Sequence, residues 1–391
     1  MNDLDAHLMQ TYRRQPVRFV RGEGMHLYDS EGKRYLDFVA GIAVNALGHA
    51  HPLVAEAVAK QSSILVHTSN LYYTEPMVAL SEKLCELLGW ADGRVFFANS
   101  GAEANECAIK VARKWSRMQS GPHRYETIAA FGSFHGRTLE TLAATGQPAK
   151  WEAFTPLPPG FVHVPFDDAP AVKAAITSIT CSVLLEPVQG EGGVIVPSPE
   201  YLPSIRTICD GANLLFLDDE VQTGLGRTGR WFGFQHEDAH PDVITLAKAL
   251  GNGLPIGACV ARGGAAEALT YGDHATTMGG GPVVCAAALA VLEVIEQDDL
   301  VTNAAQMGVY LKTKLGDLGY DVRGQGLLIA IALGRIAASS VVEACRLRGL
   351  LVNEVGPSVV RLCPPLIVSK QDCDAAVSIL GKVLTDLEVT G

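Results

Sequence analysis

The sequence predicts an α/β fold with a large, mostly parallel sheet, and three observations support that prediction. Between about residues 52 and 285, short apolar runs alternate with longer segments of helical periodicity, which is typical of a parallel sheet covered by helices on both faces. The 391 residues are enough for two or three structural units. Apolar residues make up 48% of the chain and charged residues 19%, so a sizeable core can be buried.

The expected strands of this sheet are short apolar runs that end in polar or glycine-rich loops. They are Arg94–Ala98, Thr127–Phe131, Ser182–Glu186, Leu214–Asp218, Val243–Leu246 and Ile256–Ala261. Helices are expected at Ala102–Met118 and Tyr201–Asp210. Because ligands of open parallel sheets bind at the carboxyl ends of the strands, the loops that follow these runs are the candidate site.

The two ends of the chain predict a smaller unit beside the large sheet. Residues 17–47 alternate in short stretches around the turn Asp29-Ser30-Glu31-Gly32, which favours an antiparallel hairpin region. After about residue 286 helical patterns dominate, and short strands are expected at Leu327–Ala332 and Val359–Leu362. We therefore expect an N-terminal segment 1–51 that belongs to the small domain, a large domain 52–285, and a C-terminal part 286–391.

Composition and charge exclude several classes of function. The formal net charge is −11 and no basic cluster offsets it, so neither a nucleic acid nor a membrane is expected as a partner. The longest apolar stretch, about Val283–Leu292, is too short to span a bilayer. The nine cysteines are scattered without a C-x-x-C pair and are expected to be reduced thiols. Because Met1–Asp5 also lack the pattern of a signal peptide, we expect a cytoplasmic protein.

Two short motifs match functional patterns by letter but not by context. Gly224–Gly229 reads G-x-G-x-x-G, yet Asp219–Gln222 separate it from the preceding strand and an aromatic run, 231–234, replaces the expected helix. A structural loop is therefore expected there, not a nucleotide site. His236–His240 reads H-E-x-x-H, but Pro241 follows at once and no third ligand is evident. We expect a surface loop and no metal.

Two charged positions at strand ends are candidates for chemistry. Lys248 is surrounded by apolar residues after the run Val243–Leu246; burial lowers the pKa of an amine and makes it available for a Schiff base. The alternative is a lysine whose stem lies along the surface of a short helix. Asp219 and Glu220 end another apolar run, where a buried carboxylate needs a cationic or N–H partner such as a pyridinium. The alternative is a pair of solvated loop carboxylates.

Two further groups follow neighbouring strands. Ser100-Gly101-Ala102 opens a helix whose first N–H groups can hold a phosphate, although ordinary capping by Ser100 also explains it. Phe134 can stack on a planar group and Arg137 can bind a carboxylate, against core packing and a surface arginine as alternatives. An amine, a carboxylate, a phosphate cradle and a stacking ring at one sheet edge suit pyridoxal phosphate.

The same residues lie in motifs that resemble those of the class III aminotransferases of the ornithine and acetylornithine type, which have the type I pyridoxal-phosphate transferase fold. The resemblance runs from about Leu27 to Leu387. Its motifs are Leu36-Asp37-Phe38, Gly48-His49-Ala50-His51-Pro52, 99–106, 134–138, 186–193, 219–224 and 247–251. The family also implies that both termini contribute to the small α/β domain.

The resemblance implies a pyridoxal 5'-phosphate site made of nine residues: Ser100, Gly101, Ala102, Phe134, Asp219, Val221, Gln222, Lys248 and Thr277. In the family, the lysine at 248 forms the Schiff base and acts as the general base, and the aspartate at 219 pairs with the pyridine nitrogen. The glutamine at 222 reaches the ring hydroxyl. Thr277 resembles a threonine that reaches the phosphate in the neighbouring subunit, which implies a homodimer.

The resemblance also implies a substrate site. Arg137 resembles the arginine that binds a substrate carboxylate, and Arg361 resembles the one that binds a dicarboxylic partner. Glu191 resembles the residue that masks Arg361 when an ω-amine donor is bound. A serine hydroxyl at position 276 is considered as a further substrate contact, but no role is assigned to that position, where the chain has Thr276.

Three positions depart from the family pattern, namely Asp218, Met278 and Gly281. Asp218 stands where the family usually has an apolar residue, Met278 replaces an aromatic residue, and Gly281 replaces an asparagine. These departures put the inter-subunit loop near Thr277 in doubt but remove no catalytic group.

The expected reaction transfers the terminal amino group of N2-acetyl-L-ornithine to 2-oxoglutarate, giving N-acetylglutamate 5-semialdehyde and L-glutamate in arginine biosynthesis. Ornithine aminotransferases carry a tyrosine about where Gly41 stands, and Ser69–Tyr72 is similar to the acetylornithine branch. Ornithine, 4-aminobutyrate and succinyl-diaminopimelate aminotransferases and a semialdehyde aminomutase remain alternatives. A cofactor-binding scaffold without activity would be expected to lack Lys248 or Asp219.

Overall fold

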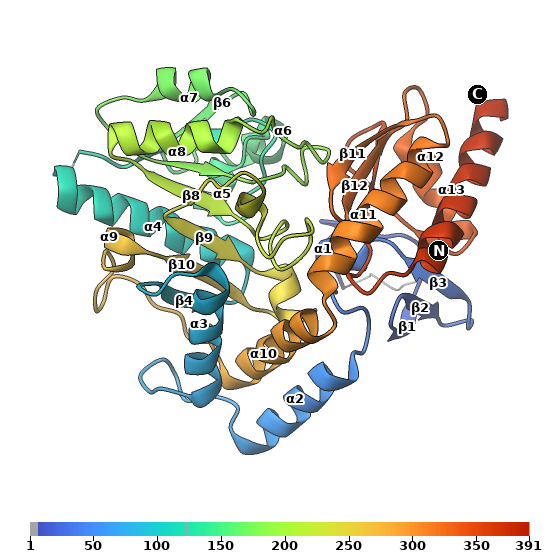
Figure 1. Ribbon diagram of the computed structural model, residues 1–391, viewed down its shortest axis with the longest axis horizontal. Helices are drawn as coiled ribbons and strands as arrows, with labels where there is room; N and C mark the ends of the chain where they lie inside the picture. The colour runs from blue at the N-terminus through green and yellow to red at the C-terminus, as the bar shows by residue number, and fades with distance from the viewer. Residues whose placement is uncertain (1–6, 122, 391) are drawn as a thin grey trace.

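A computed structural model describes residues 7–121 and 123–390, which form two domains side by side (Figure 1). The N-terminal residues 1–5, for which no targeting signal is expected, lie outside the described part of the chain. The large domain contains the central sheet, and the small domain contains both ends of the chain. Helix α10 (Pro282–Gln297) runs from the large domain toward α11 (Leu300–Gly316) of the small domain, so residue 285 lies inside α10.

Seven strands form the central sheet in the order β4-β10-β9-β8-β7-β5-β6. Their bounds are β4 Arg94–Ala98, β5 Glu126–Ala130, β6 Phe161–Val164, β7 Thr180–Leu185, β8 Leu215–Asp219, β9 Val243–Leu246 and β10 Gly257–Ala261. Neighbouring strands from β9 to β6 are parallel, and β10 alone in this sheet runs antiparallel, to both β4 and β9. The carboxyl ends of β4, β5, β7, β8 and β9 therefore meet at one edge of the sheet.

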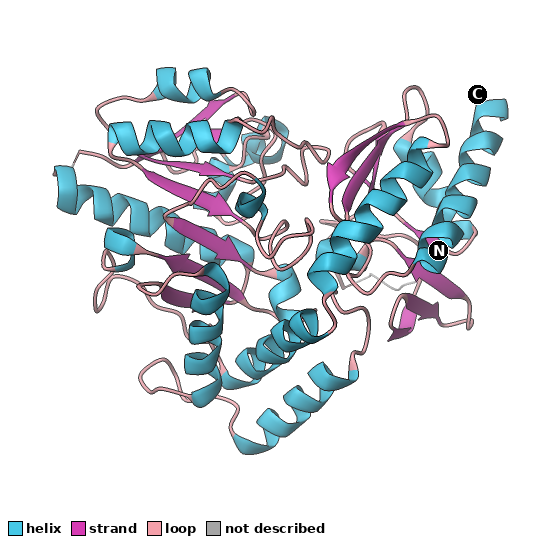
Figure 2. Cartoon of the chain, viewed as in Figure 1, coloured by secondary structure: helices cyan, strands magenta, loops and turns pink. Residues whose placement is uncertain are grey.

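Helices cover both faces of this sheet (Figure 2). On one face α4 (Gly101–Ser120), α5 (Leu139–Ala144) and α9 (Gly263–Ala266) bury small apolar side chains against the strands. On the other face lie α3 (Glu75–Leu88), α7 (Ala169–Ala175), α8 (Tyr201–Ala212) and α10. Helix α2 (Pro52–Ile64) packs on α10. Because the strands are buried on both sides, they read as continuous apolar runs.

The small domain is built from both ends of the chain. Strands β11 (Asp321–Gln325), β12 (Leu328–Ala332), β15 (Val359–Leu362) and β14 (Asn353–Glu354) form an antiparallel sheet, covered by α11, α12 (Ala338–Leu347) and α13 (Lys370–Thr390). A second sheet orders β1 (Phe19–Glu23), β2 (His26–Asp29), β3 (Arg34–Asp37) and β13 (Leu350–Leu351). Leu36 lies opposite Leu350 in this sheet, so N-terminal and C-terminal segments share one ladder.

The strands and helices that were predicted by residue range agree with the structure within two residues, but the strands β6, β11, β13 and β14 were not predicted. Strand β6 escaped prediction because Phe161–Val164 is short and follows a proline-rich loop. The turn expected at 29–32 lies between β2 and β3, where the Asp29 carboxylate accepts the N–H groups of Glu31 and Lys33 and Gly32 adopts a φ of +83°. None of the helices in the described ranges combines the length and apolar character needed to cross a bilayer.

Candidate active site

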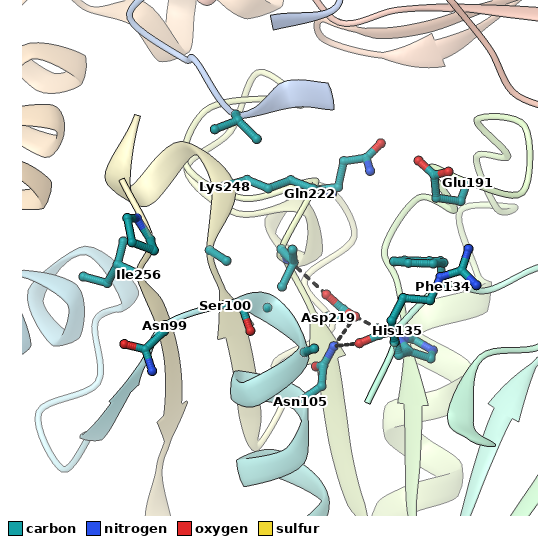
Figure 3. Close-up of a pocket in the computed structure, with 18 of the residues that line it drawn as sticks. Asn99, Ser100, Asn105, Phe134, His135, Glu191, Asp219, Gln222, Lys248 and Ile256 are labelled. Atoms are coloured by element: carbon teal, nitrogen blue, oxygen red, sulfur yellow. Dashed lines mark hydrogen bonds and ion pairs between the residues drawn. The ribbon is translucent and has the colours of Figure 1, made fainter. Parts of the chain in front are cut away.

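The predicted residues converge on one cavity of about 390 Å³ at the carboxyl edge of the sheet, facing the small domain (Figure 3). Ten predicted site residues line it: Ser100, Gly101, Ala102, Phe134, Arg137, Glu191, Asp219, Val221, Gln222 and Lys248. They come from the loops after five different strands, which meet because those strands run in the same direction. Arg361 contacts the lining from β15, and Thr277 does not line the cavity.

Position 276 requires a correction to the set of residues considered. The residue there is Thr276, not a serine, and it lies outside the cavity that holds the other predicted residues. Its Oγ1 accepts the backbone N–H of Gly279 at 3.2 Å and the Nδ2–H of Asn99 at 3.4 Å. The hydroxyl at position 276 therefore holds the loop before Gly279 against Asn99 at the end of β4.

Asp219 ends β8 and is held as an acceptor on the cavity floor. Its Oδ2 atom accepts the Nδ2–H of Asn105 at 2.7 Å and lies 2.8 Å from Nδ1 of His135. Its Oδ1 atom accepts the backbone N–H of Val221 at 3.1 Å. The dashed lines of Figure 3 show these contacts. One carboxylate oxygen is thus fixed by two side chains, while the other has a single neighbour and capacity for a further donor.

Asn105 and His135 are positioning residues that the sequence did not single out. The Asn105 amide also donates to the backbone oxygen of His135 at 2.8 Å and accepts the hydroxyl of Thr245 at 2.7 Å. All three side chains are buried. The only signal in the sequence was their place inside the motifs 99–106 and 134–138, because helix spacing alone cannot show that Asn105 turns toward β8.

Helix α4 begins at the cavity wall. Ser100 is its N-cap, and its Oγ accepts the N–H of Glu103 at 3.2 Å, so capping explains this side chain. The N–H groups of Gly101 and Ala102 face no acceptor among the described residues. A Cβ atom at Gly101 would lie 2.8 Å from Cγ1 of Val221, so only glycine keeps this wall open. Free N–H donors at a helix start form an anion site.

Lys248 reaches the cavity from the short 3₁₀ turn η3 (Lys248–Gly251) that follows β9. Its φ of +42° is unusual for a residue with a side chain. Its amine has no hydrogen-bond or ion-pair partner among the described residues. Burial lowers the pKa of Lys248, and the charge of Arg361 acts in the same direction, while Glu191 and Asp219 oppose the shift. A free amine is therefore more available here than in water.

Arg361 and Glu191 form an ion pair across the cavity. Nη1 of Arg361 lies 2.6 Å from Oε1 of Glu191 and 3.0 Å from Oε1 of Gln222, and its Nε donates to Asn353. The Arg361 side chain is 1% exposed and that of Glu191 is 25% exposed. Burial raises the pKa of Glu191, but the Arg361 charge outweighs burial and the net pKa is lowered. Glu191 is thus held ionised.

A second buried carboxyl group, Glu186, was not predicted as a site residue. It accepts the N–H groups of Phe134 at 3.1 Å and Gly190 at 3.3 Å, so it ties the loops after β5 and β7 together. Burial raises the pKa of Glu186 to about 7, with the negative charge of Asp219 adding to the shift and His135 opposing it. Its position after β7 was visible in the sequence, but its contact with the Phe134 loop was not.

The two motifs judged by context have no part in the cavity. Gly224–Gly229 is a packed loop: a Cβ atom at Gly229 would lie 2.9 Å from Ala305, and the buried Arg227 donates to the backbone oxygens of Leu327 and Pro364. His236 ends the 3₁₀ turn η2 (Gly233–His236) and contacts Thr228 through Nε2. His240 lies beyond it and pairs with Asp238, so the two imidazoles do not share a helical face.

The chain is similar over nearly its whole length to known enzymes. The family model of class III aminotransferases matches residues 9–384. The acetylornithine aminotransferase of Methanocaldococcus jannaschii is 49% identical over 97% of this chain and 96% of that protein. That of Streptomyces coelicolor is 50% identical over 96% and 93%. Among solved structures, the ornithine aminotransferase of Toxoplasma gondii has a TM-score of 0.94 and 32% identity over 99% of this chain and 94% of that one.

The chain belongs to the class III aminotransferases, a family of pyridoxal-phosphate-dependent enzymes. The two-domain architecture is the type I fold of that family. The cavity fits the cofactor on this structure's own evidence. Unpartnered N–H groups at Gly101 and Ala102 suit a phosphate, the open oxygen of Asp219 suits a ring N–H, and the amine of Lys248 is unpaired among the described residues.

Proposed function

We propose that this aminotransferase transfers the terminal amino group of N2-acetyl-L-ornithine to 2-oxoglutarate, giving N-acetylglutamate 5-semialdehyde and L-glutamate in arginine biosynthesis. The observation that carries the proposal is the buried ion pair of Arg361 and Glu191 near Lys248, because it can offer or hide a cation at the reacting end of the cavity. The relatives named acetylornithine aminotransferase support the acetylated donor.

Pyridoxal phosphate would supply an electron sink that draws off the negative charge developed when the reacting C–H bond breaks. Lys248 would hold the cofactor covalently and, after the donor amine displaces it, take the proton from the substrate carbon. Its lowered pKa favours the neutral amine that both tasks require. Asp219 would accept the ring N–H through its open oxygen, and Asn105 and His135 would keep that carboxylate oriented.

The remaining lining residues would hold and orient the cofactor. The N–H groups of Gly101 and Ala102, with Ser100, would receive its phosphate at the start of α4. Phe134 and Val221 would cover its two ring faces. Gln222, which already accepts a hydrogen bond from Arg361, would reach the ring hydroxyl and so connect the cofactor to the substrate arginine.

Two arginines would let one cavity accept two different substrates. Arg137 would bind the carboxylate at the far end of either substrate, and Arg361 would bind the carboxylate next to the reacting carbon of glutamate. With the ω-amine donor no such carboxylate is present, and Glu191 would neutralise Arg361 at 2.6 Å, as observed. Release of Glu191 on arrival of 2-oxoglutarate would then be a shift between two pre-existing side-chain states.

Ornithine is the second candidate donor, because of the similarity to the ornithine aminotransferase of T. gondii. The turn at Gly41 favours the acetylated donor, because it leaves little room for a side chain that could bind a free α-amino group. Gly41 has a φ of +66° in a turn where Ala40, Ile42 and Ala43 also have positive φ values. A Cβ atom at Gly41 would lie 3.3 Å from Cβ of Val44, which lines the cavity. No phenol is present there to bind a free α-amino group.

We also propose that the chain acts as a homodimer in the cytoplasm. Thr277 is exposed and lines a separate small groove together with Asn70, Tyr72 and Pro282. Leu71 and Tyr73 are 83% and 91% exposed and Tyr271 is fully exposed. Large apolar side chains that are exposed together are typical of subunit interfaces. A second copy covering this region would bring its Thr277 toward the phosphate site. All nine cysteines are free thiols, which supports a reducing compartment.

A donor panel tests the proposal. The purified protein is supplied with pyridoxal phosphate and 2-oxoglutarate, and glutamate formation is measured with acetylornithine, ornithine, 4-aminobutyrate and succinyl-diaminopimelate. We expect the highest kcat/KM for acetylornithine, by about tenfold or more, which corresponds to about 1.4 kcal/mol of transition-state binding. A higher kcat/KM for another donor would show that this other compound, and not acetylornithine, is the preferred substrate. No glutamate from any donor, with cofactor bound, would favour the non-catalytic scaffold.

A further inference from the structure

Two cations beside Phe134 have no anionic partner among the described residues. The Cζ atom of Arg137 lies 5.5 Å from the centroid of the Phe134 ring, and the Nζ atom of Lys150 lies 4.8 Å from it. Neither side chain makes a hydrogen bond or an ion pair in the described part of the chain. The sequence holds 42 acidic residues against 31 lysines and arginines, so a general shortage of carboxylates does not explain this.

Lys150 is fixed in place by the segment that carries it, helix α6 (Pro148–Trp151). The N–H of Gly146 donates to Oγ of Ser133 at 3.0 Å, and the Gln147 amide donates to the backbone oxygen of Ser133 at 2.9 Å. A Cβ atom at Gly146 would lie 2.0 Å from the oxygen of Ala130. The Lys150 segment is therefore bound closely to the loop that carries Phe134, and the position of Lys150 follows from packing.

Lys150 lies against the same Phe134 ring as Arg137; Phe134 and Arg137 line the cavity, and Lys150 lies beside that lining. Burial lowers the pKa of Lys150; Glu191 opposes that shift, and Arg137 adds to it. Glu191 is already paired with Arg361 at 2.6 Å, so it does not neutralise Lys150. Lys150 is half-buried and Arg137 is exposed. Two cations next to one aromatic ring repel each other, and an incoming carboxylate would relieve that repulsion.

We propose that Lys150 and Arg137 together form the binding site for the substrate carboxylate farthest from the reacting amine, and that Lys150 thereby restricts the donors to acidic ω-amines. This inference rests on the proposed aminotransferase function and extends it to a residue that the matched motifs do not contain. Arg137 would fix the orientation of the carboxylate through its two-pronged guanidinium, and Lys150 would add a point charge. The ring of Phe134 would carry both cations on the side of the donor's far end.

The test compares two donors that differ only in the carboxylate: N2-acetyl-L-ornithine and N-acetyl-1,4-diaminobutane. Lys150→Met removes the charge and keeps the chain length. We expect kcat/KM for acetylornithine in the donor half-reaction to fall about 10- to 100-fold, chiefly through KM, as for loss of a hydrogen bond to a charged group. For the decarboxylated donor we expect a change below about threefold. Lys150→Arg should restore most of the loss.

Binding without turnover gives a second readout. The dissociation constant of N-acetyl-L-norvaline, which has the carboxylate but no reacting amine, should rise by a similar factor in Lys150→Met, and the visible spectrum of the bound cofactor should not change. Lys173→Met, at an exposed position of α7, is the matched control and should leave both constants unchanged. An equal loss for the two donors, or no loss at all, would overturn the proposal.

Failure of the inference and failure of the proposed donor can be told apart. If the wild-type enzyme prefers another acidic ω-amine, the test uses that donor and its decarboxylated analogue. Lys150→Met should then again lower kcat/KM for the acidic donor much more than for its analogue. If the wild-type enzyme uses both members of the pair equally well, the carboxylate is not recognised, and the role of Lys150 is refuted even though the transaminase assignment stands.

Discussion

Asp218 and Asp219 are neighbours at the end of β8, yet they lie in opposite environments. Asp219 points into the cavity and accepts hydrogen bonds from Asn105, Val221 and its neighbour His135. Asp218 points to the other face of the sheet, is fully buried, and neither oxygen has a hydrogen-bond donor among the described residues. One face of the strand supplies hydrogen-bond partners to its carboxyl group, and the other face supplies none among the described residues.

The environment of Asp218 forces it to keep its proton. Burial raises the pKa of Asp218 well above its usual range, and the negative charges of Glu220 and Asp219 add to the shift. Glu220 is also buried, but it accepts the hydroxyl of Thr223 and the N–H of Phe234. Of these two carboxyl groups Glu220 is therefore the better anion, and a protonated Asp218 can donate to it. The comparison teaches that a buried carboxyl group serves catalysis only where donors surround it.

Of substitutions at Asp218 and Asp219, Asp219→Asn should reduce activity far more. A neutral amide cannot keep the pyridine nitrogen protonated, so the electron sink is weakened. We expect a loss of about 1000-fold in the single-turnover rate, with little change in the melting temperature. A rate within about tenfold of wild type, with cofactor fully bound, would show that the hydrogen bonds around Asp219 serve packing alone.

Arg361→Ala should have the next largest effect, and on one half-reaction only. Loss of a charge-assisted contact of about 2–4 kcal/mol predicts a 30- to 1000-fold lower kcat/KM for glutamate. Arg137→Ala should impair both half-reactions, because each substrate carries a carboxylate at that end. Rapid-mixing measurements give kcat/KM of each half-reaction separately for the two variants. Equal losses with acetylornithine and glutamate in Arg361→Ala would refute the masking role of Glu191.

Asp218→Asn should stabilise the protein and leave activity within about twofold. The amide can still donate to Glu220 without a buried ionisable group. We expect the free energy of unfolding at pH 8 to rise by about 1–3 kcal/mol, seen as a higher midpoint in urea with the slope unchanged. Destabilisation of similar size would show that Asp218 has a donor partner and is not strained by burial.

The pH dependence of that gain separates the two aspartates further. The folded pKa of Asp218 is raised, so between its unfolded pKa of about 4 and its folded pKa the native state holds a proton that the unfolded state has lost. The contribution of Asp218 to stability is therefore greatest at low pH and declines as pH rises through this window. The advantage of Asp218→Asn should be small near pH 4.5 and grow toward pH 8. A pH-independent difference would contradict this origin.

The sequence predicted the sheet and the first residues of the site because each strand is a continuous apolar run followed by glycine or a charge. Lys248, Asp219 and Gly101 each follow such a run. Asn105, Glu186 and Lys150 escaped prediction because their roles depend on which way a helix or loop turns relative to strands distant in sequence. Strand β6 was missed because its four residues, Phe161–Val164, follow a proline-rich loop that gives no strand signal. The local sequence pattern predicts where a strand ends. Contacts between loops depend on how strands distant in sequence pack together, which the local pattern does not show.

Lys248 offers the most direct test of the central claim that the loops at this sheet edge form one aminotransferase site. The holoenzyme is reduced with borohydride, digested, and its peptides are mapped by mass spectrometry. We expect the phosphopyridoxyl group on Lys248, one per chain, and no multiple turnover in Lys248→Ala, although cofactor still binds there noncovalently. Attachment to a different lysine, or near-normal steady-state activity in Lys248→Ala, would contradict the claim.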